Sequence, residues 1–186
     1  MFQEEKRSST TLIVSMVVLV VIAVLGGAWW WRKNNVPFAK ATVTSTGVMP
    51  LHLKYKHVFG NVEDQSEDAT YVVARVKVED NDPNPLFVKD VTMAVMTGDG
   101  ATMNGSALQQ ADMEQALAAF PKLRALADGA GGKALVRETT IAPRGAAEGY
   151  VVFQFPVPQK FWDERQNAEI KVDFYHNQTT TAAVPK

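Results

Sequence analysis

The 186-residue chain has no cysteine. Disulfides, thiolate zinc sites, iron–sulfur clusters, cysteine nucleophiles and lipid attachment through a cysteine are therefore excluded. The chain also lacks an excess of charge of either sign, because 19 Lys and Arg residues balance 20 Asp and Glu residues. A nucleic-acid-binding surface would show as an excess of basic residues, so we expect no nucleic-acid partner.

Apolar residues are concentrated near the N-terminus, where Leu12 to Ala28 contains no charge and three tryptophans follow. At 1.5 Å per residue, these roughly 20 residues span about 30 Å, the hydrocarbon thickness of a bilayer. Tryptophan rings prefer the headgroup level, and two basic residues supply a polar stop. The pattern predicts an N-terminal tail (1–11), a transmembrane anchor (12–31) that contacts lipid, and an interface made by Trp29, Trp30, Trp31, Arg32 and Lys33.

A cleaved signal peptide is the alternative, because Gly26 and Ala28 are small residues at a spacing that suits signal peptidase. The apolar run is longer than a typical h-region, which favours a retained anchor. Lys6 and Arg7 balance Arg32 and Lys33, so flanking charge does not set the orientation. The absence of cysteine and a β-rich remainder favour a single-pass protein of the cell membrane with its domain outside the cytoplasm, and a cytosolic domain is the alternative.

After a linker (32–38), residues 39–177 are expected to form one domain, followed by a flexible tail (178–186). Period-two alternation predicts half-buried strands at 72–79, 91–95, 151–155 and 170–174. Weaker strands are predicted at 39–45, 51–58 and 134–141. About seven short strands without βαβ alternation indicate an all-β fold, an immunoglobulin-like antiparallel β-sandwich.

One segment near 106–128 departs from the β pattern and predicts a helical insertion. Ser106 can cap a helix, Pro121 is expected to break it, and Gly129 is expected to end its second part. The apolar residues of this segment gather on one side of a helix. Such a helix either covers the core of its own domain or binds a partner.

The segment 140–156, with the sequence TIAPRGAAEGYVVFQFP, resembles a signature of telokin-like, immunoglobulin-fold domains in bacterial membrane-anchored proteins of unknown function. The segment 70–81, TYVVARVKVEDN, is similar to the long strand that precedes a polar turn in those domains. The resemblance implies an anchored extracytoplasmic binding or scaffolding module. It implies no catalytic residue.

The run 79–87 resembles the calcium-binding linker of cadherins, and Asp80, Asn81 and Asp82 are its candidate ligands. The acidic loop with Glu63, Asp64, Glu67 and Asp68 could add ligands. Asp, Asn and Pro also suit an ordinary polar turn.

Methionine and histidine side chains could form a site for cuprous copper. The candidate ligands are Met93, Met96, Met103, Met113, His52 and His57. Met93 and Met113 lie at predicted core positions, where methionine commonly fills gaps in the packing.

No Gly-x-Ser-x-Gly or His-Glu-x-x-His motif is present, so we predict neither catalytic residues nor a cofactor. A hydrolase using His52, His57 or His176 is a less favoured hypothesis. Trp162 and Tyr175 lie in aromatic clusters near the C-terminus, which suit either a buried corner or a partner surface. The leading hypothesis is a non-enzymatic accessory component of a cell-envelope assembly with a protein partner, and a calcium- or copper-binding envelope protein is the alternative.

Overall fold

The computed structural model describes residues 9–35, 37–55 and 65–186 and divides the chain into two compact units, Met1–Pro37 and Phe38–Lys186. In the first unit, helix α1 (Ser9–Asn35) exceeds the predicted span and includes residues 32–35, which were predicted as linker. Its segment Ile13–Trp31 has a mean hydropathy of 2.4 and is not buried within the described structure. The helix is therefore long and apolar enough to cross a bilayer, a property that signal sequences share.

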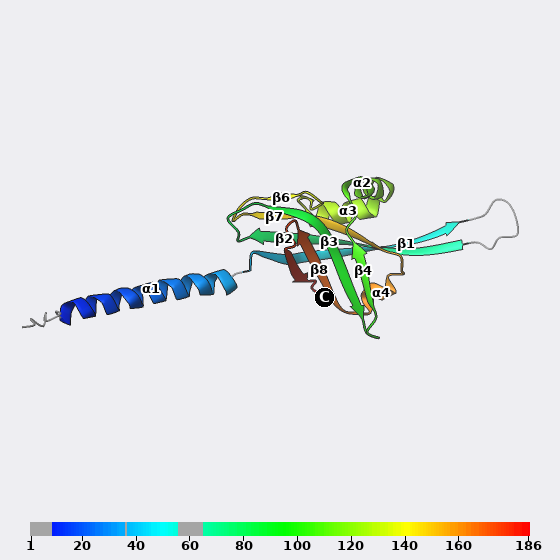
Figure 1. Ribbon diagram of the computed structural model, residues 1–186. Coiled ribbons are helices and arrows are strands. Elements are labelled where there is room, and N and C mark those ends of the chain that lie inside the picture. The colour runs from blue at the N-terminus through cyan, green and yellow to red at the C-terminus, as the bar shows by residue number, and fades with distance from the viewer. Residues whose placement is uncertain (1–8, 36, 56–64) are drawn as a thin grey trace, which may run out of the picture. The chain divides into compact units, whose positions relative to one another are not determined.

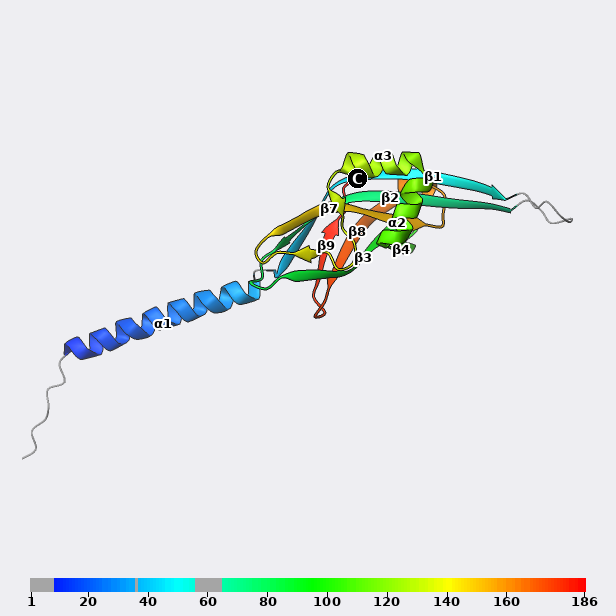
Figure 2. The ribbon, with the colours of Figure 1, turned by 90° about the horizontal axis from the view of Figure 1, so that it is seen from above.

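The second unit contains two β-sheets, which confirms the predicted β-sandwich (Figures 1 and 2). One sheet has the order β1 (Ala39–Tyr55), β2 (Gln65–Asp80), β7 (Ala146–Phe155) and β5 (Lys133–Ala134). The other has the order β4 (Thr102–Ser106), β3 (Leu86–Thr97), β8 (Arg165–Phe174) and β9 (Thr179–Ala183), and β6 (Thr140–Ile141) pairs with β3. We refer to them as the β1–β2–β7–β5 sheet and the β4–β3–β8–β9 sheet. Neighbouring strands are antiparallel except β5 and β7.

The strands predicted from period-two alternation each have one face in the core between the sheets. Val72, Ala74, Val76 and Val78 of β2 are fully buried there. The largest fully buried side chains of this core are Phe153, Phe155, Phe174, Met93, Ile141 and Ile170. Burial of this apolar area is the main stabilising contribution to the fold.

Helices α2 (Gln110–Ala119) and α3 (Pro121–Ala130) lie over the outer face of the β1–β2–β7–β5 sheet (Figure 1). This face contributes Met49, Tyr71, Val73 and Val152 to a second apolar cluster, and the helices contribute Met113, Leu123 and Ala130. A short helix, α4 (Lys160–Asp163), precedes β8. The helices thus cover an apolar face of their own domain.

The ends of these two helices differ from the prediction. Ser106 does not cap a helix, because it pairs with Thr92 at the end of β4, and α2 begins after Gln109 without a side-chain cap. Pro121 occupies the first turn of α3, a position where its missing N–H is tolerated. The helix ends at Ala130, not Gly129, because Gly131 adopts the left-handed φ of 72° that ends it.

Two predicted strand boundaries are wrong. Residues 39–45 and 51–55 belong to one strand, β1, whose phase changes at an irregularity between Val43 and Ser45. The predicted strand 134–141 is instead divided between β5 and β6, which pair with different sheets.

The C-terminal segment, predicted to be a flexible tail, forms the outer strand β9 and pairs with β8. Ala182 and Val184 alternate with exposed residues and are both 6% exposed, so they belong to the core. The prediction was wrong because a Thr- and Ala-rich strand has weak apolar contrast.

Strands β1 and β2 continue beyond the rest of their sheet (Figure 2). The pairing of β1 with β2 runs to Tyr55 and Gln65, whereas the pairing of β2 with β7 stops at Thr70. Residues 51–55 and 65–69 therefore form a projecting two-stranded ribbon.

Candidate functional site

The site begins at a bulge in β3. Val88 pairs with Phe174 and Asp90 pairs with Asp173, so Lys89 is the extra residue of the ladder. Val88 is fully buried, whereas Lys89 is exposed and Asp90 half-buried. A bulge redirects side chains, and this one presents two consecutive polar residues beside β8.

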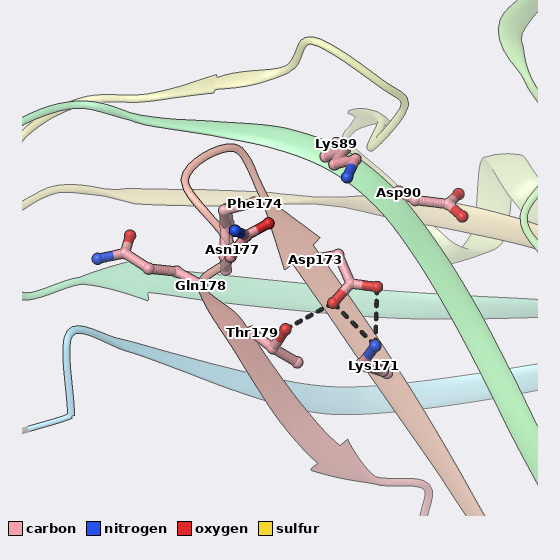
Figure 3. Close-up of a pocket in the computed structure, with 8 residues that line it drawn as sticks. All are labelled: Lys89, Asp90, Lys171, Asp173, Phe174, Asn177, Gln178 and Thr179. Carbon is pink, nitrogen blue, oxygen red and sulfur yellow. Dashed lines mark hydrogen bonds and ion pairs between the residues drawn. The ribbon is translucent and has the colours of Figure 1, made fainter.

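The turn between β8 and β9 forms the opposite side of the site. The strands are joined by three residues, 175–177, and two of them, His176 and Asn177, have left-handed φ of 71° and 59°. The backbone N–H of Phe174 donates to the Gln178 carbonyl at 2.8 Å, which closes the turn. A shallow cavity of about 370 Å³ lies between turn and bulge (Figure 3), lined by Lys89, Asp90, Lys171, Asp173, Phe174, Asn177, Gln178 and Thr179.

Asp173 is the most constrained polar group of this cavity. Its carboxylate accepts a hydrogen bond from Thr179 Oγ1 at 2.6 Å and lies 3.0 Å from Lys171 Nζ (Figure 3). Burial raises the pKa of Asp173, but the two hydrogen bonds and the charges of Lys171 and Lys89 outweigh it, so its pKa is lowered. Asp173 is therefore held as a paired carboxylate, and it positions Lys171 and Thr179.

A second cavity of about 370 Å³ shares Lys89 and Asp90 and is also lined by Ser106, Ala107, Gln109 and Arg137. The interaction with the Tyr175 side chain raises the pKa of Arg137, whose exposed guanidinium lies beside the tyrosine. The backbone N–H of Tyr175 in turn donates to the carbonyl of Phe87, whose side chain is 41% exposed. We call the surface made by Phe87, Lys89, Asp90, Arg137, Lys171, Asp173 and Tyr175 the bulge site.

Chemically, the bulge site combines fixed charges of both signs with two partly exposed aromatic rings. Aromatic residues and arginine contribute most binding energy at protein interfaces, and paired charges add specificity. No histidine lines the two cavities, so they offer polar recognition and no imidazole base.

Of the two residues predicted for a partner surface, Tyr175 belongs to the bulge site. The prediction is wrong for Trp162, which is 4% exposed because it packs into the core and its ring lies 4.1 Å below the guanidinium of Arg165. Sequence reasoning missed Phe87, Lys89 and Arg137. One signal was present, since the adjacent polar pair Lys89–Asp90 interrupts the alternation of β3.

The predicted calcium ligands lie at the end of β2. Asp80 Oδ1 accepts the backbone N–H of Asp82 at 2.7 Å, and Asp82 Oδ1 accepts that of Asn84 at 2.9 Å. Glu67 and Asp68 cannot add ligands, because 12 residues of extended strand, about 40 Å, separate Asp68 from Asp80. Glu63 and Asp64 lie outside the described residues. Within the described ranges, no three His, Asp or Glu side chains gather as a metal site.

The predicted copper ligands are separated by the β1–β2–β7–β5 sheet. Met93 is buried between the sheets, whereas Met113 is buried under the helices on the outer face of that sheet, so the two sulfurs cannot share an ion. Met103 packs partly against the inter-sheet core, and Met96 is 37% exposed.

The histidines do not form a common site either. His52 Nδ1 lies 2.6 Å from Asp68 Oδ1 on the projecting ribbon, and His176 belongs to the β8–β9 turn. His57 lies outside the described residues. In helix α1, Trp29, Trp30 and Trp31 are 64–67% exposed, and Arg32 and Lys33 continue the helix.

No family model and no curated protein matches the chain. Among solved structures, it is similar to an uncharacterised β-sandwich protein from Clostridium difficile 630, with a TM-score of 0.39 and 8% identity over 81% of this chain and 87% of that chain. It is also similar to a solution structure described as a late embryogenesis abundant (LEA) protein, with a TM-score of 0.38 and 11% identity over 99% of this chain and 91% of that chain. Likenesses this distant transfer neither a ligand nor site residues.

Proposed function

We propose that this protein is a single-pass membrane protein that displays its β-sandwich outside the cytoplasm as a non-enzymatic binding or scaffolding module of an envelope assembly. The observation that carries the proposal is the order of the parts along the chain: an apolar helix of spanning length, Ile13–Trp31, precedes a two-sheet domain whose first strand begins at Ala39. The absence of cysteine and the β-sandwich architecture support the outward orientation.

We further propose that the sandwich is immunoglobulin-like and related to telokin-like domains. Strands β1, β2 and β7 in one sheet and β4, β3, β8 and β9 in the other follow the A-B-E and C′-C-F-G order of immunoglobulin-type sandwiches. In this scheme α2 and α3 are an insertion between strands C′ and E. The telokin-like signature coincides with β6, the turn at Arg144 and β7.

The bulge site is the surface that we propose for the protein partner. It has an exposed ring at Phe87 and a half-buried ring at Tyr175, and it has charged groups beside neighbours in the fold: Lys171 is paired with Asp173, and Arg137 lies beside Tyr175. Side chains that are ordered before binding lose less conformational entropy on binding.

Site-specific photocrosslinking in intact membranes tests this function. A photoreactive residue at position 175 is expected to give a discrete crosslinked species that Lys89→Glu and Arg137→Glu weaken. The same probe at Asp112, an exposed position on α2, is the matched control. Equal crosslinking at 112 and 175, or crosslinking at 175 that the two charge reversals leave unchanged, would contradict a partner at the bulge site.

A further inference from the structure

Asp80, the last residue of β2, has a buried carboxylate that the domain satisfies only in part. The residue is 3% exposed. Its Oδ1 accepts the backbone N–H of Asp82, but its Oδ2 has no hydrogen-bond partner in the described part of the chain and is closed to solvent. Neither Asp80 nor Asp82 forms an ion pair with a described residue. A buried carboxylate oxygen normally has a donor or a cation as its partner.

Three chain segments meet at the backbone of Asp80, Asn81 and Asp82. The N–H of Asp80 donates to Gly145 O at 2.8 Å, that of Asn81 to Phe38 O at 2.8 Å, and that of Arg144 to Asp82 O at 3.2 Å. Each of these carbonyls has used one lone pair and has a second one that can bind a cation. The surroundings of Asp80 are thus rich in hard oxygen atoms, which are the ligands that calcium prefers.

We propose that Asp80 Oδ2 is the anchoring ligand of a calcium site at this end of the sandwich, with Asp82 and backbone carbonyls of the converging segments as the remaining protein ligands. The proposal does not need the acidic residues of the projecting ribbon, and it is independent of the proposed partner binding. With only two carboxylates, the site belongs to the weak class of extracellular modules, with a Kd of about 10⁻⁴ to 10⁻³ M. Bound calcium would join the first residue of the domain, Phe38, to the loops after β2 and before β7.

The test is a calcium titration of the full-length protein in detergent micelles after treatment with a chelator, followed by calorimetry and thermal unfolding. At 10 mM calcium, the Tm of the wild type is expected to rise by about 3–11 °C, because a ligand at 10 to 100 times its Kd stabilises the folded state. Asp80→Asn keeps an oxygen for the Asp82 N–H and removes the charge. This variant is expected to fold and to lose the rise. Asp112→Asn, at an exposed position on α2, is the charge-matched control and should keep it.

Several results would overturn the site. They are a wild type without binding heat or a Tm rise, an equal rise in Asp80→Asn, and an equal rise with magnesium, which would indicate unspecific charge screening. If Asp80→Asn does not fold, Asp82→Asn replaces it and must weaken calcium binding at least threefold. Failure of this site would leave the crosslinking at position 175 unaffected, so the two proposals are tested separately.

Discussion

Gly149→Ala is expected to destabilise the domain through one steric conflict. Gly149 lies in β7, and β5 pairs with it in the domain's parallel strand pair through Lys133. A Cβ on Gly149 would overlap the carbonyl oxygen of Lys133 and lie 3.3 Å from the backbone nitrogen of Leu135. Both are backbone atoms, so β5 must move away from β7 and weaken the hydrogen bond from Leu135 N–H to Tyr150 O, which is 2.8 Å long.

Overpacking of this kind costs about 3 kcal/mol when rigid backbone opposes it. For a protein of this size the loss corresponds to a fall in Tm of about 6–12 °C. Far-UV circular dichroism of the full-length protein in micelles, during heating and in a denaturant titration, measures the change.

Gly129→Ala is the matched control, because an added Cβ at this exposed position of α3 meets nothing within 4 Å. Alanine in a helix is more favourable than glycine by about 0.5–1 kcal/mol, so the Tm should rise by about 1–4 °C. A Gly149→Ala variant as stable as the wild type, or two variants destabilised alike, would refute the placement of β5 against β7.

Three further predictions concern the packing and the polar contacts of the domain. Leu123→Ala removes a fully buried side chain between α3 and the outer face of the β1–β2–β7–β5 sheet. It should lower the free energy of unfolding by about 2–5 kcal/mol in denaturant titrations. A change below about 0.5 kcal/mol would mean that the helices do not pack there. Thr70→Val removes the 2.7 Å hydrogen bond from Thr70 Oγ1 to the Val157 carbonyl and should lower stability by about 1 kcal/mol in the same assay, and an unchanged midpoint would argue against that bond. The pKa of Asp173 is lowered in the folded state, so its stabilising contribution is present above its unfolded pKa of about 3.9 and is lost as the pH falls through the lower folded value. Thr179→Val removes one cause of this lowered pKa and should therefore reduce the loss of stability between about pH 5 and pH 2. An identical pH profile in wild type and variant would contradict this pairing.

The sequence predicted those strands whose two faces differ strongly in polarity. The alternation at Ala74, Val76 and Val78 is unambiguous because the charged residues Arg75 and Lys77 separate them, and this strand is central in its sheet. Strand β9 has the same alternation but uses Ala182 among threonines, so its pattern is too weak to identify a buried face. A sequence predicts a strand when apolar and polar residues alternate clearly along it; burial without such alternation leaves no pattern to read.

The candidate site was less predictable because it depends on contacts between distant segments. Lys89, Arg137 and Tyr175 come from three parts of the chain, and the bulge in β3 and the turn between β8 and β9 are what bring them together. Lys89 carried only the interrupted alternation of β3, Arg137 carried no signal, and Tyr175 carried an aromatic one. Trp162 carried the same aromatic signal, yet its ring is buried beside Arg165, because composition does not distinguish a core ring from an interface ring.

The central claim is that the Ile13–Trp31 helix is a retained anchor and that the β-sandwich lies outside the cytoplasm. A reporter active only outside the cytoplasm, fused after Lys186, tests it together with alkaline extraction of membranes and the mass of the mature chain. The account predicts an active reporter on a full-length chain that stays in the membrane fraction. An inactive reporter on a stable, membrane-bound fusion, or an active reporter on a soluble chain cleaved near Ala28, would contradict it.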